Sequence, residues 1–402
     1  MNILMLTQEY PADDVGKELT PVVHFFTKEW VKHGYNVRAI NLPTNFPSLI
    51  YALAKPFQRR LESKFNTGIR TYKLSKREYT LDGVPVLRVP LRKMKPHGRF
   101  SSSEIERAMG EIVDFLNKTS CKPDVIIGHW TNPCVEVMLG LKKIYNVPTV
   151  LCMHDSGFDF RGVYRNEYQE ILKGIDVWGW RSYYIKREFE KEFGIQERNF
   201  MCFSGVPEKY IQPNVNRTFA SVRKFIFVGQ LIKYKHPFEY LKALDRSDFN
   251  DFVLDIVGHG FEANAIKGYI SKNRHLESKV NLCGRIPRDE VSKKMGEADV
   301  FCMISDHETF GLVYIEAMAA GCITIASRDA GFDGIIKDGE NGFLCEAGNV
   351  EELTQILNRI NRMEPKELIS ISRKAIETAI VMTDEKVALN YIQSVEQLIK
   401  RV

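Results

Sequence analysis

Short runs rich in β-branched and aromatic residues alternate with longer amphipathic segments along most of the chain. Such alternation favours parallel sheets with helices on both faces, so we expect an α/β fold with two doubly wound, Rossmann-like units. Strands of the first unit are expected at 2–7, 36–41, 84–89, 125–128, 148–152 and 199–203. Strands of the second are expected at 225–228, 252–257, 280–283, 300–304, 322–326 and 342–345. Helical patterns lie between them, for example at 22–33, 102–118, 188–193, 237–244, 288–295 and 350–362.

The length of 402 residues suits two domains, because one hydrophobic core rarely grows that large. The alternation restarts near residue 222, after a Pro- and Asn-containing stretch at 212–217 that is typical of a linker. We therefore place an N-terminal domain at 1–208 and a second domain at 218–380. A helical tail follows at 381–402, with an apolar stripe suited to core packing.

A formal net charge of +5 is too mild to require a nucleic acid partner. The charge is concentrated, however, because residues 55–99 hold thirteen Lys or Arg and three Asp or Glu, with aromatic residues among them. This basic block is expected to be an insertion of loops and short helices. It is either a solvated face or a surface for an acceptor or an anionic membrane.

Three further features bear on localisation and cofactors. The eight cysteines are scattered without a C-x-x-C pair, which favours buried thiols in a reducing compartment over disulfides or zinc. The N-terminus lacks the basic region and apolar length of a signal peptide, and no 18-residue apolar stretch could span a bilayer. We expect a cytoplasmic protein, with any membrane contact peripheral and at the cytoplasmic face.

Two carboxylates frame the most informative segment, which runs from Glu308 to Glu316 and continues into an Ala-Met-Ala-Ala-Gly sequence. Between them, Phe310-Gly311 has the character of a helix start. The N-terminus of a helix presents unpaired N–H groups and a positive dipole end to an anion. One carboxylate would lie at the mouth of this anion site and the other two turns into the helix. Such an arrangement suits a phosphorylated, hydroxyl-rich ligand such as a nucleotide sugar.

Other glycine turns follow strands in the same half of the chain. They are Val228-Gly229-Gln230-Leu231 with Lys235-His236 beyond it, Val257-Gly-His-Gly260, and Asp338-Gly-Glu-Asn-Gly-Phe-Leu344. Taken with Glu308–Gly321, these motifs resemble those of the retaining glycosyltransferases of family 4 (glycosyl transferases group 1), which have the GT-B fold of two facing Rossmann-like domains. The resemblance is strong over 222–350 and weaker in the N-terminal half.

The resemblance implies a role for each matching position. Glu308 would contact the donor sugar and the reacting centre, and backbone groups of Phe310, Gly311 and Leu312 would hold sugar and phosphate. Glu316 would accept hydrogen bonds from the ribose, and Lys235 would neutralise the leaving diphosphate. From the N-terminal domain, His154 would face the donor sugar and Gly16 would lie near the phosphates. The tail resembles the family's helix that crosses back onto the N-terminal domain.

Two positions depart from the family pattern. Gln230 stands where the family usually has arginine, and Gly16 stands alone where a pair of glycines is common. Lys17 or Lys233 could supply the missing cation. The chain has no Asp-x-Asp sequence for a hard cation, and a lysine with a helix N-terminus can stabilise a leaving diphosphate without one.

We therefore expect a metal-independent, retaining glycosyltransferase of hexosyltransferase type without a cofactor. Its donor would be a UDP- or GDP-sugar and its acceptor a glycan or lipid-linked oligosaccharide, in surface polysaccharide biosynthesis. Three alternatives stay open. The sequence Gly258-x-Gly260-x-x-Ala263, with Glu277 beyond it, also fits the dinucleotide fingerprint of an NAD(P)-dependent oxidoreductase. The others are a catalytically impaired glycosyltransferase-like binding protein and an RNA- or membrane-binding protein that uses the basic block.

Overall fold

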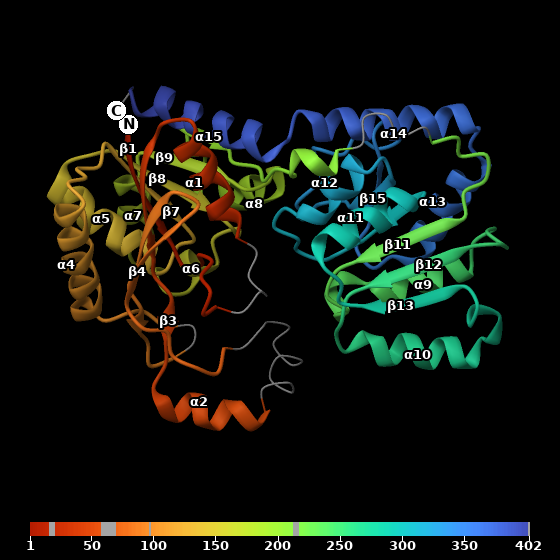
Figure 1. Ribbon diagram of the computed structural model, residues 1–402, viewed down its shortest axis with the longest axis horizontal. Coiled ribbons are helices and arrows are strands. Elements are labelled where there is room, and N and C mark those ends of the chain that lie inside the picture. Colours follow the sequence, from red (N-terminus) through yellow and green to blue (C-terminus); the bar gives the residue numbers. More distant parts are fainter. Residues whose placement is uncertain (16–20, 58–69, 96–97, 212–216, 401–402) are drawn as a thin grey trace. The chain divides into compact units, whose positions relative to one another are not determined.

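A computed structural model describes residues 1–15, 21–57, 70–95, 98–211 and 217–400 (Figure 1). The chain forms two compact units. Unit 1 comprises Met1–Arg181, Ile185–Cys202 and Asp384–Val402, and unit 2 comprises Ser182–Tyr184 and Phe203–Thr383. The divisions at 203 and 384 lie near the boundaries at 208 and 381 that the sequence indicates.

The described part of unit 1 is built on an eight-stranded sheet with the order β10-β9-β8-β7-β1-β2-β5-β4. Its strands are β1 (Asn2–Thr7), β2 (Asn36–Asn41), β4 (Arg77–Leu81), β5 (Val84–Arg88), β7 (Val125–His129), β8 (Thr149–Met153), β9 (Val177–Trp180) and β10 (Asn199–Met201). Neighbouring strands are parallel, and β4 pairs antiparallel to β5 at one edge. A small parallel pair, β3 (Thr44–Asn45) and β6 (Leu91–Arg92), lies outside this sheet.

Helices connect these strands. They are α1 (Val22–Lys32), α2 (Ser48–Ala54) with the 3₁₀ turn η1 (Lys55–Phe57), α4 (Ser102–Lys118), α5 (Cys134–Tyr145), α6 (Phe158–Arg161), α7 (Tyr168–Gly174), α8 (Tyr183–Phe193) and α15 (Asp384–Ile399). The tail helix α15 packs on α1, where the buried Trp30 donates its indole N–H to the Ala388 carbonyl at 2.7 Å. Unit 1 thus contains residues from both ends of the chain.

Unit 2 has a parallel six-stranded sheet in its described residues, with the order β13-β12-β11-β14-β15-β16. The strands are β11 (Lys224–Val228), β12 (Val253–Val257), β13 (Val280–Gly284), β14 (Val300–Cys302), β15 (Ile323–Ser327) and β16 (Phe343–Cys345). The helices are η2 (Glu208–Tyr210), η3 (Lys233–Lys235), α9 (Pro237–Asp245), α10 (Glu262–Lys272), η4 (Arg274–Leu276), α11 (Arg288–Glu297), α12 (Leu312–Ala319), α13 (Val350–Arg362) and α14 (Pro365–Ile380).

The helix α13 illustrates how sequence determines these elements. The Asn349 side chain accepts a hydrogen bond from the Glu352 N–H at 3.0 Å, and such a cap stabilises a helix by about 1 kcal/mol. Leu353, Leu357 and Ile360 then recur at helical spacing and are fully buried against the sheet side of unit 2. The predicted alternation of strands and helices in two doubly wound units is confirmed.

Part of the prediction was wrong. The basic block is not only loops and short helices, because it contributes the unpredicted edge strand β4 to the main sheet of unit 1, beside β5, which corresponds to the strand expected at 84–89. The strand β9 was not predicted at all. Among the described residues, no helix has the length and apolar character needed to cross a membrane.

The strand order places a switch point in each sheet. In unit 2 the chain leaves β11 for β12 on one side and later returns to β14 on the other. In unit 1 the strands β1 and β7 flank the corresponding position. Ligands of open α/β sheets bind outside the carboxyl ends of strands at such points. The loops after β11 and β14, and those after β1, β7 and β8, are therefore where a site is expected.

Candidate functional site

The loops after β11 and β14 bring the predicted pair Lys235 and Glu308 together in unit 2. The Lys235 ammonium lies 3.3 Å from Glu308 Oε2, and both side chains are less than one-fifth exposed. The aliphatic part of Lys235 passes over Gly229, whose ideal Cβ would lie 3.5 Å from Lys235 Cδ. The two residues are 73 positions apart in sequence and meet because β11 and β14 are neighbours.

The residue after Lys235 ties the same two loops together. His236 has a left-handed backbone (φ 52°), a conformation that glycine adopts more readily than other residues. Its Nε2 lies 2.9 Å from Asp306 Oδ2, and its Nδ1 lies 3.4 Å from Glu239 Oε2. Burial alone would lower the pKa of His236, but the hydrogen bonds and charges of Glu239 and Asp306 outweigh it and raise that pKa. An imidazolium is therefore favoured between these carboxylates. Its role was not predicted from the sequence.

The start of α12 has the geometry expected of an anion site. Gly311 precedes the helix with φ 85°, and a Cβ there would lie 2.4 Å from the Tyr314 ring and 3.1 Å from Glu308 Cγ. Tyr314 is buried and donates its hydroxyl to the Met303 carbonyl at 2.8 Å, which fixes the first turn to the end of β14. Among the described residues, no side chain caps this N-terminus. The Tyr314 N–H turns back to the Gly311 carbonyl at 3.0 Å, and the N–H groups that precede this position in a helix have no intrahelical acceptors.

Phe310 contributes its backbone to this turn while its side chain is buried. The ring packs on Phe203 and Phe332, with centroids 5.8 and 5.1 Å away. Gly331 packs directly against this backbone. A Cβ on Gly331 would lie only 2.6 Å from Phe310 N and 2.7 Å from the Glu308 carbonyl oxygen, so a larger residue does not fit there. The segment 308–312 is thus held on both sides, which suits a preorganised site.

The second carboxylate has a cation of its own. Arg288, in the first turn of α11, donates from Nε and Nη2 to Glu316 Oε1 at 2.8 and 2.5 Å. Leu312, the first residue of α12, lies one turn before Glu316. The predicted hydrogen bond from a ribose to Glu316 remains a prediction, and a ribose would share this carboxylate with Arg288. The arginine was missed because no motif places it near Glu316.

Gln230 is exposed in the turn after β11. Beside it, the backbone N–H of Leu231 donates to the His259 carbonyl at 2.8 Å, and the Glu262 N–H donates to the Leu231 carbonyl at 2.9 Å. A Cβ on Gly260 would lie 2.2 Å from the same Leu231 oxygen. Gly260, the second glycine of the dinucleotide fingerprint, therefore leaves room for the backbone of Leu231. Leu231 lies at the start of α10, where a pyrophosphate would bind. This packing argues against the oxidoreductase alternative.

In unit 1, His154 follows β8 and His129 ends β7. His154 Nε2 lies 2.9 Å from His129 Nδ1, and the His154 ring stacks on Trp130 at 3.9 Å. Burial, together with the charges of His129 and Arg181, holds the pKa of His154 well below its usual value, so the ring is neutral. Gly16, predicted to lie near the phosphates, falls outside the described residues, as does Lys17.

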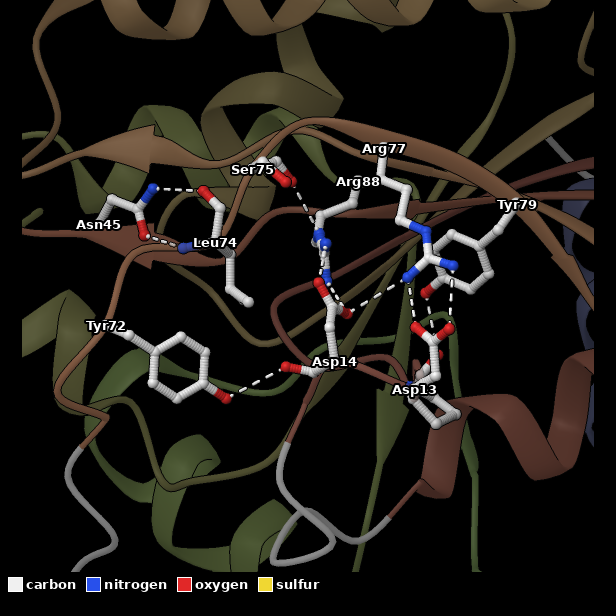
Figure 2. Close-up of polar contacts among 10 residues, drawn as sticks. Asp13, Asp14, Asn45, Tyr72, Leu74, Ser75, Arg77, Tyr79 and Arg88 are labelled. Carbon is white, nitrogen blue, oxygen red and sulfur yellow. Dashed lines mark hydrogen bonds and ion pairs between the residues drawn. The ribbon is translucent and has the colours of Figure 1, made fainter.

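The loop leading to Gly16 is anchored by arginines of the basic block (Figure 2). Arg88 is fully buried and holds both oxygens of Asp14, at 2.8 and 2.5 Å, while its Nε donates to the Ser75 carbonyl. Arg77 forms a paired contact with the exposed Asp13. These arginines of the block therefore serve internal contacts of unit 1.

The structure thus gathers Lys235, Glu308, Phe310, Gly311 and Leu312 at one edge of the unit 2 sheet, with Glu316 in the second turn of α12 and Gln230 in the adjoining turn. His154 lies at the corresponding edge of the unit 1 sheet. In the described part of the chain, no three His, Cys, Asp or Glu side chains form a group that could hold a metal ion.

Comparison with known proteins indicates the class of enzyme. Residues 209–378 match the family described as Glycosyl transferases group 1. An uncharacterized glycosyltransferase of Methanocaldococcus jannaschii is 28% identical over 261 residues, covering 62% of this chain and 69% of the relative. The alpha-monoglucosyldiacylglycerol synthase of Acholeplasma laidlawii is 33% identical over 254 residues, covering 62% of this chain and 55% of the relative.

The fold is also that of solved structures. The crystal structure of Anabaena HepE in complex with UDP and glucose superposes with a TM-score of 0.66 at 17% identity, covering 99% of this chain and 100% of that one. The predicted GT-B fold and glycosyltransferase class are confirmed. Assignment to family 4 in particular stays a prediction.

Proposed function

Residues 209–378 match the family of glycosyl transferases group 1, and we propose on this basis that the chain transfers a sugar from a nucleotide-sugar donor to a glycan or lipid-linked acceptor in surface polysaccharide biosynthesis. We propose a UDP- or GDP-sugar as donor, retention of the anomeric configuration, and no metal or other cofactor. The observation that carries the proposal is the Lys235–Glu308 pair at 3.3 Å, beside the N-terminus of α12.

The chemistry follows from charge. Expulsion of a nucleoside diphosphate develops negative charge on its oxygens, and fixed cations and N–H groups in a dry site stabilise that charge. A diphosphate carries more charge than one carboxylate, so it would draw Lys235 away from Glu308. Glu308 would then contact the donor sugar, while the backbone at Phe310, Gly311 and Leu312 holds sugar and phosphate. The bound UDP of HepE supports a nucleotide donor.

Transfer with retention assigns the remaining roles. The acceptor hydroxyl would attack the donor sugar on the same face from which the nucleoside diphosphate leaves. The leaving phosphate would accept the proton of that hydroxyl. His154 is proposed to contact the donor sugar, and Glu316 the ribose. With glutamine at position 230, Lys235 and the helix terminus would carry the diphosphate charge largely alone.

The acceptor proposal includes a peripheral contact with anionic membrane. The surface we favour is the stripe Leu49, Leu53 and Phe57, which are 69%, 63% and 55% exposed and recur every four residues along α2 and η1. Tyr51, on the opposite side of α2, is buried and its hydroxyl accepts from the Phe46 N–H at 3.0 Å. In sequence, residues 55–73 carry six Lys or Arg and one Glu. An apolar stripe that is followed in sequence by basic residues suits an anionic bilayer surface, and the lipid named for the A. laidlawii synthase supports the same proposal.

Nucleotide release from UDP-, GDP- and ADP-sugars would test the transfer. We expect release with at least one donor, and its loss in Glu308→Ala and Lys235→Ala although both variants remain folded, as shown by cooperative thermal unfolding. Lys267→Ala is the matched control, because Lys267 is an exposed lysine on α10 of the same unit. Wild-type rates in either site variant would refute the assignment. Nucleotide binding without release by any donor would favour the impaired glycosyltransferase, and NADH binding would revive the oxidoreductase.

Co-sedimentation with vesicles would test the membrane contact. Leu49→Glu with Leu53→Glu is expected to abolish binding to vesicles containing anionic lipid. Ile195→Glu, at another exposed apolar side chain of unit 1 (79% exposed), should leave that binding unchanged. Equal binding of all three proteins would contradict the proposal.

A further inference from the structure

A chain of hydrogen bonds runs through unit 1 from the end of β8 to the helix α15. His154 Nε2 lies 2.9 Å from His129 Nδ1, and His129 Nε2 lies 3.0 Å from the Tyr391 hydroxyl. That hydroxyl lies 2.6 Å from Cys152 Sγ. We call these four residues the histidine chain. His129 and Cys152 are fully buried and Tyr391 is 1% exposed, so water does not satisfy these groups.

All four members are uncharged near neutral pH. Burial and the nearby charge of Arg181 hold the pKa of His129 well below its usual value, as they do for His154. Burial raises the pKa of the Tyr391 hydroxyl and of the Cys152 thiol well above their usual values. Each imidazole therefore has one nitrogen that donates and one that accepts.

This constraint leaves two orderings of the protons. In the first, Tyr391 donates to His129 Nε2, His129 Nδ1–H donates to His154 Nε2, and His154 carries its proton on Nδ1. In the second, every bond is reversed, and His154 Nδ1 becomes an acceptor. The direction of the hydrogen bond between Tyr391 and His129 thus decides whether Nδ1 of His154, at the other end of the histidine chain, is a donor or an acceptor.

The acidity of the groups favours the first ordering. A phenol hydroxyl is a stronger acid than a neutral imidazole N–H, and an imidazole nitrogen is a good acceptor, so a bond in which Tyr391 O–H donates to His129 Nε2 is the better one. In that ordering the proton of His154 is left on Nδ1.

We propose that Tyr391 sets the tautomer of His154, so that His154 presents Nδ1–H as a hydrogen-bond donor at the carboxyl edge of the unit 1 sheet. Stacking on Trp130, with 16° between the ring planes, fixes the plane in which that donor lies. The partner this edge would recognise is an oxygen of a neutral hydroxyl group, as on a sugar. Tyr391 is thereby a positioning residue supplied by the C-terminal helix.

The inference rests on the proposed function, because His154 matters to transfer only if it contacts the donor sugar. Tyr391→Phe isolates the hydroxyl. The ring's packing on Phe26, Trp30 and Phe200, with centroids 5.1, 5.0 and 4.9 Å away, can persist in this variant. Cys152→Ser is the matched control, because it changes the other partner of the Tyr391 hydroxyl and still provides a group that can donate or accept there.

Nitrogen-15 NMR of histidine-labelled protein reads the tautomer of each ring directly and needs no substrate. We expect His154 to carry its proton on Nδ1 in the wild type and in Cys152→Ser, and to lose that preference in Tyr391→Phe. A wild-type His154 protonated on Nε2, or an unchanged tautomer in Tyr391→Phe, would overturn the inference.

Release of UDP from UDP-glucose is the second readout. Tyr391→Phe is expected to lower kcat by on the order of tenfold or more, as loss of an orienting partner commonly does, with UDP binding unchanged. A changed tautomer with a wild-type rate would overturn the link to transfer. If the wild type itself releases no UDP, the proposed reaction with this donor fails, while the tautomer measurement still decides whether Tyr391 controls His154.

Discussion

His236 offers the sharpest test of how the unit 2 site is held together. The residue joins the Lys235 turn to the segment that carries Glu308, because its imidazole lies between Glu239 and Asp306. His236→Asn is the informative change. Asparagine tolerates the left-handed backbone observed here (φ 52°), so the variant removes the charge without imposing new backbone strain. His236→Gly would instead mix loss of charge with relief of strain.

The magnitude follows from the geometry. A hydrogen bond to a charged group contributes about 1.5–3 kcal/mol. The His236 side chain is 13% exposed and that of Asp306 is 42% exposed, so solvent screening places this bond near the lower end. We expect a coupling free energy of about 1–1.5 kcal/mol between His236 and Asp306, from a double-mutant cycle of urea unfolding with His236→Asn and Asp306→Asn.

The pH dependence has a definite sign. The pKa of His236 is raised above 6.5, so its contribution is fully present below that pH and is lost as pH rises through the raised pKa. The coupling between His236 and Asp306 should therefore be fully present near pH 6, below the usual pKa of an imidazole, and shrink as the pH rises toward about 9. A coupling that is constant over this range, or that grows with pH, would show that His236 is not an imidazolium bridge.

Two further predictions concern the neighbouring loops. Gln230→Arg restores the cation common in the family and should tighten nucleotide binding by about tenfold, the equivalent of 1.4 kcal/mol, in titration calorimetry; unchanged affinity would place position 230 away from the phosphates. Asp14→Asn leaves the fully buried Arg88 guanidinium without its charged partner. Because the Asp14 side chain is 41% exposed, solvent screening reduces the effect, and the free energy of unfolding should fall by about 1–2 kcal/mol. Asp13→Asn, at the exposed neighbouring pair, should change it little. Equal effects of the two substitutions would contradict the distinction.

The strands that the sequence identified are those with continuous apolar runs, and β9 shows why others were missed. Its sequence Val-Trp-Gly-Trp is short, and glycine weakens a strand pattern. The structure explains that glycine, because a Cβ on Gly179 would lie 2.6 Å from Cys152 Sγ on the neighbouring strand β8. The edge strand β4 was missed for a different reason. Its residues Arg77–Leu81 are half-buried or exposed and carry charges, so no apolar run marks it.

The site was predictable one element at a time but not as an arrangement. Periodicity locates the ends of β11 and β14, yet only the strand order, which depends on packing of the whole sheet, makes these ends neighbours. For the same reason the partners His236–Asp306 and Arg288–Glu316 could not be read from spacing. Each joins elements far apart in sequence, and no local pattern records that they meet.

These unpredicted contacts have a common consequence for the two-glutamate segment. Lys235 pairs with Glu308, and Arg288 pairs with Glu316, so each carboxylate of the segment has a cation supplied by a different element of unit 2. An unpaired, partly buried carboxylate would destabilise the fold, whereas these pairs keep the local charge balanced. Binding of a diphosphate would then be an exchange of one anion for another at Lys235. On this reasoning the affinity for the nucleotide depends on how strongly Glu308 competes for Lys235, as well as on the number of cations present.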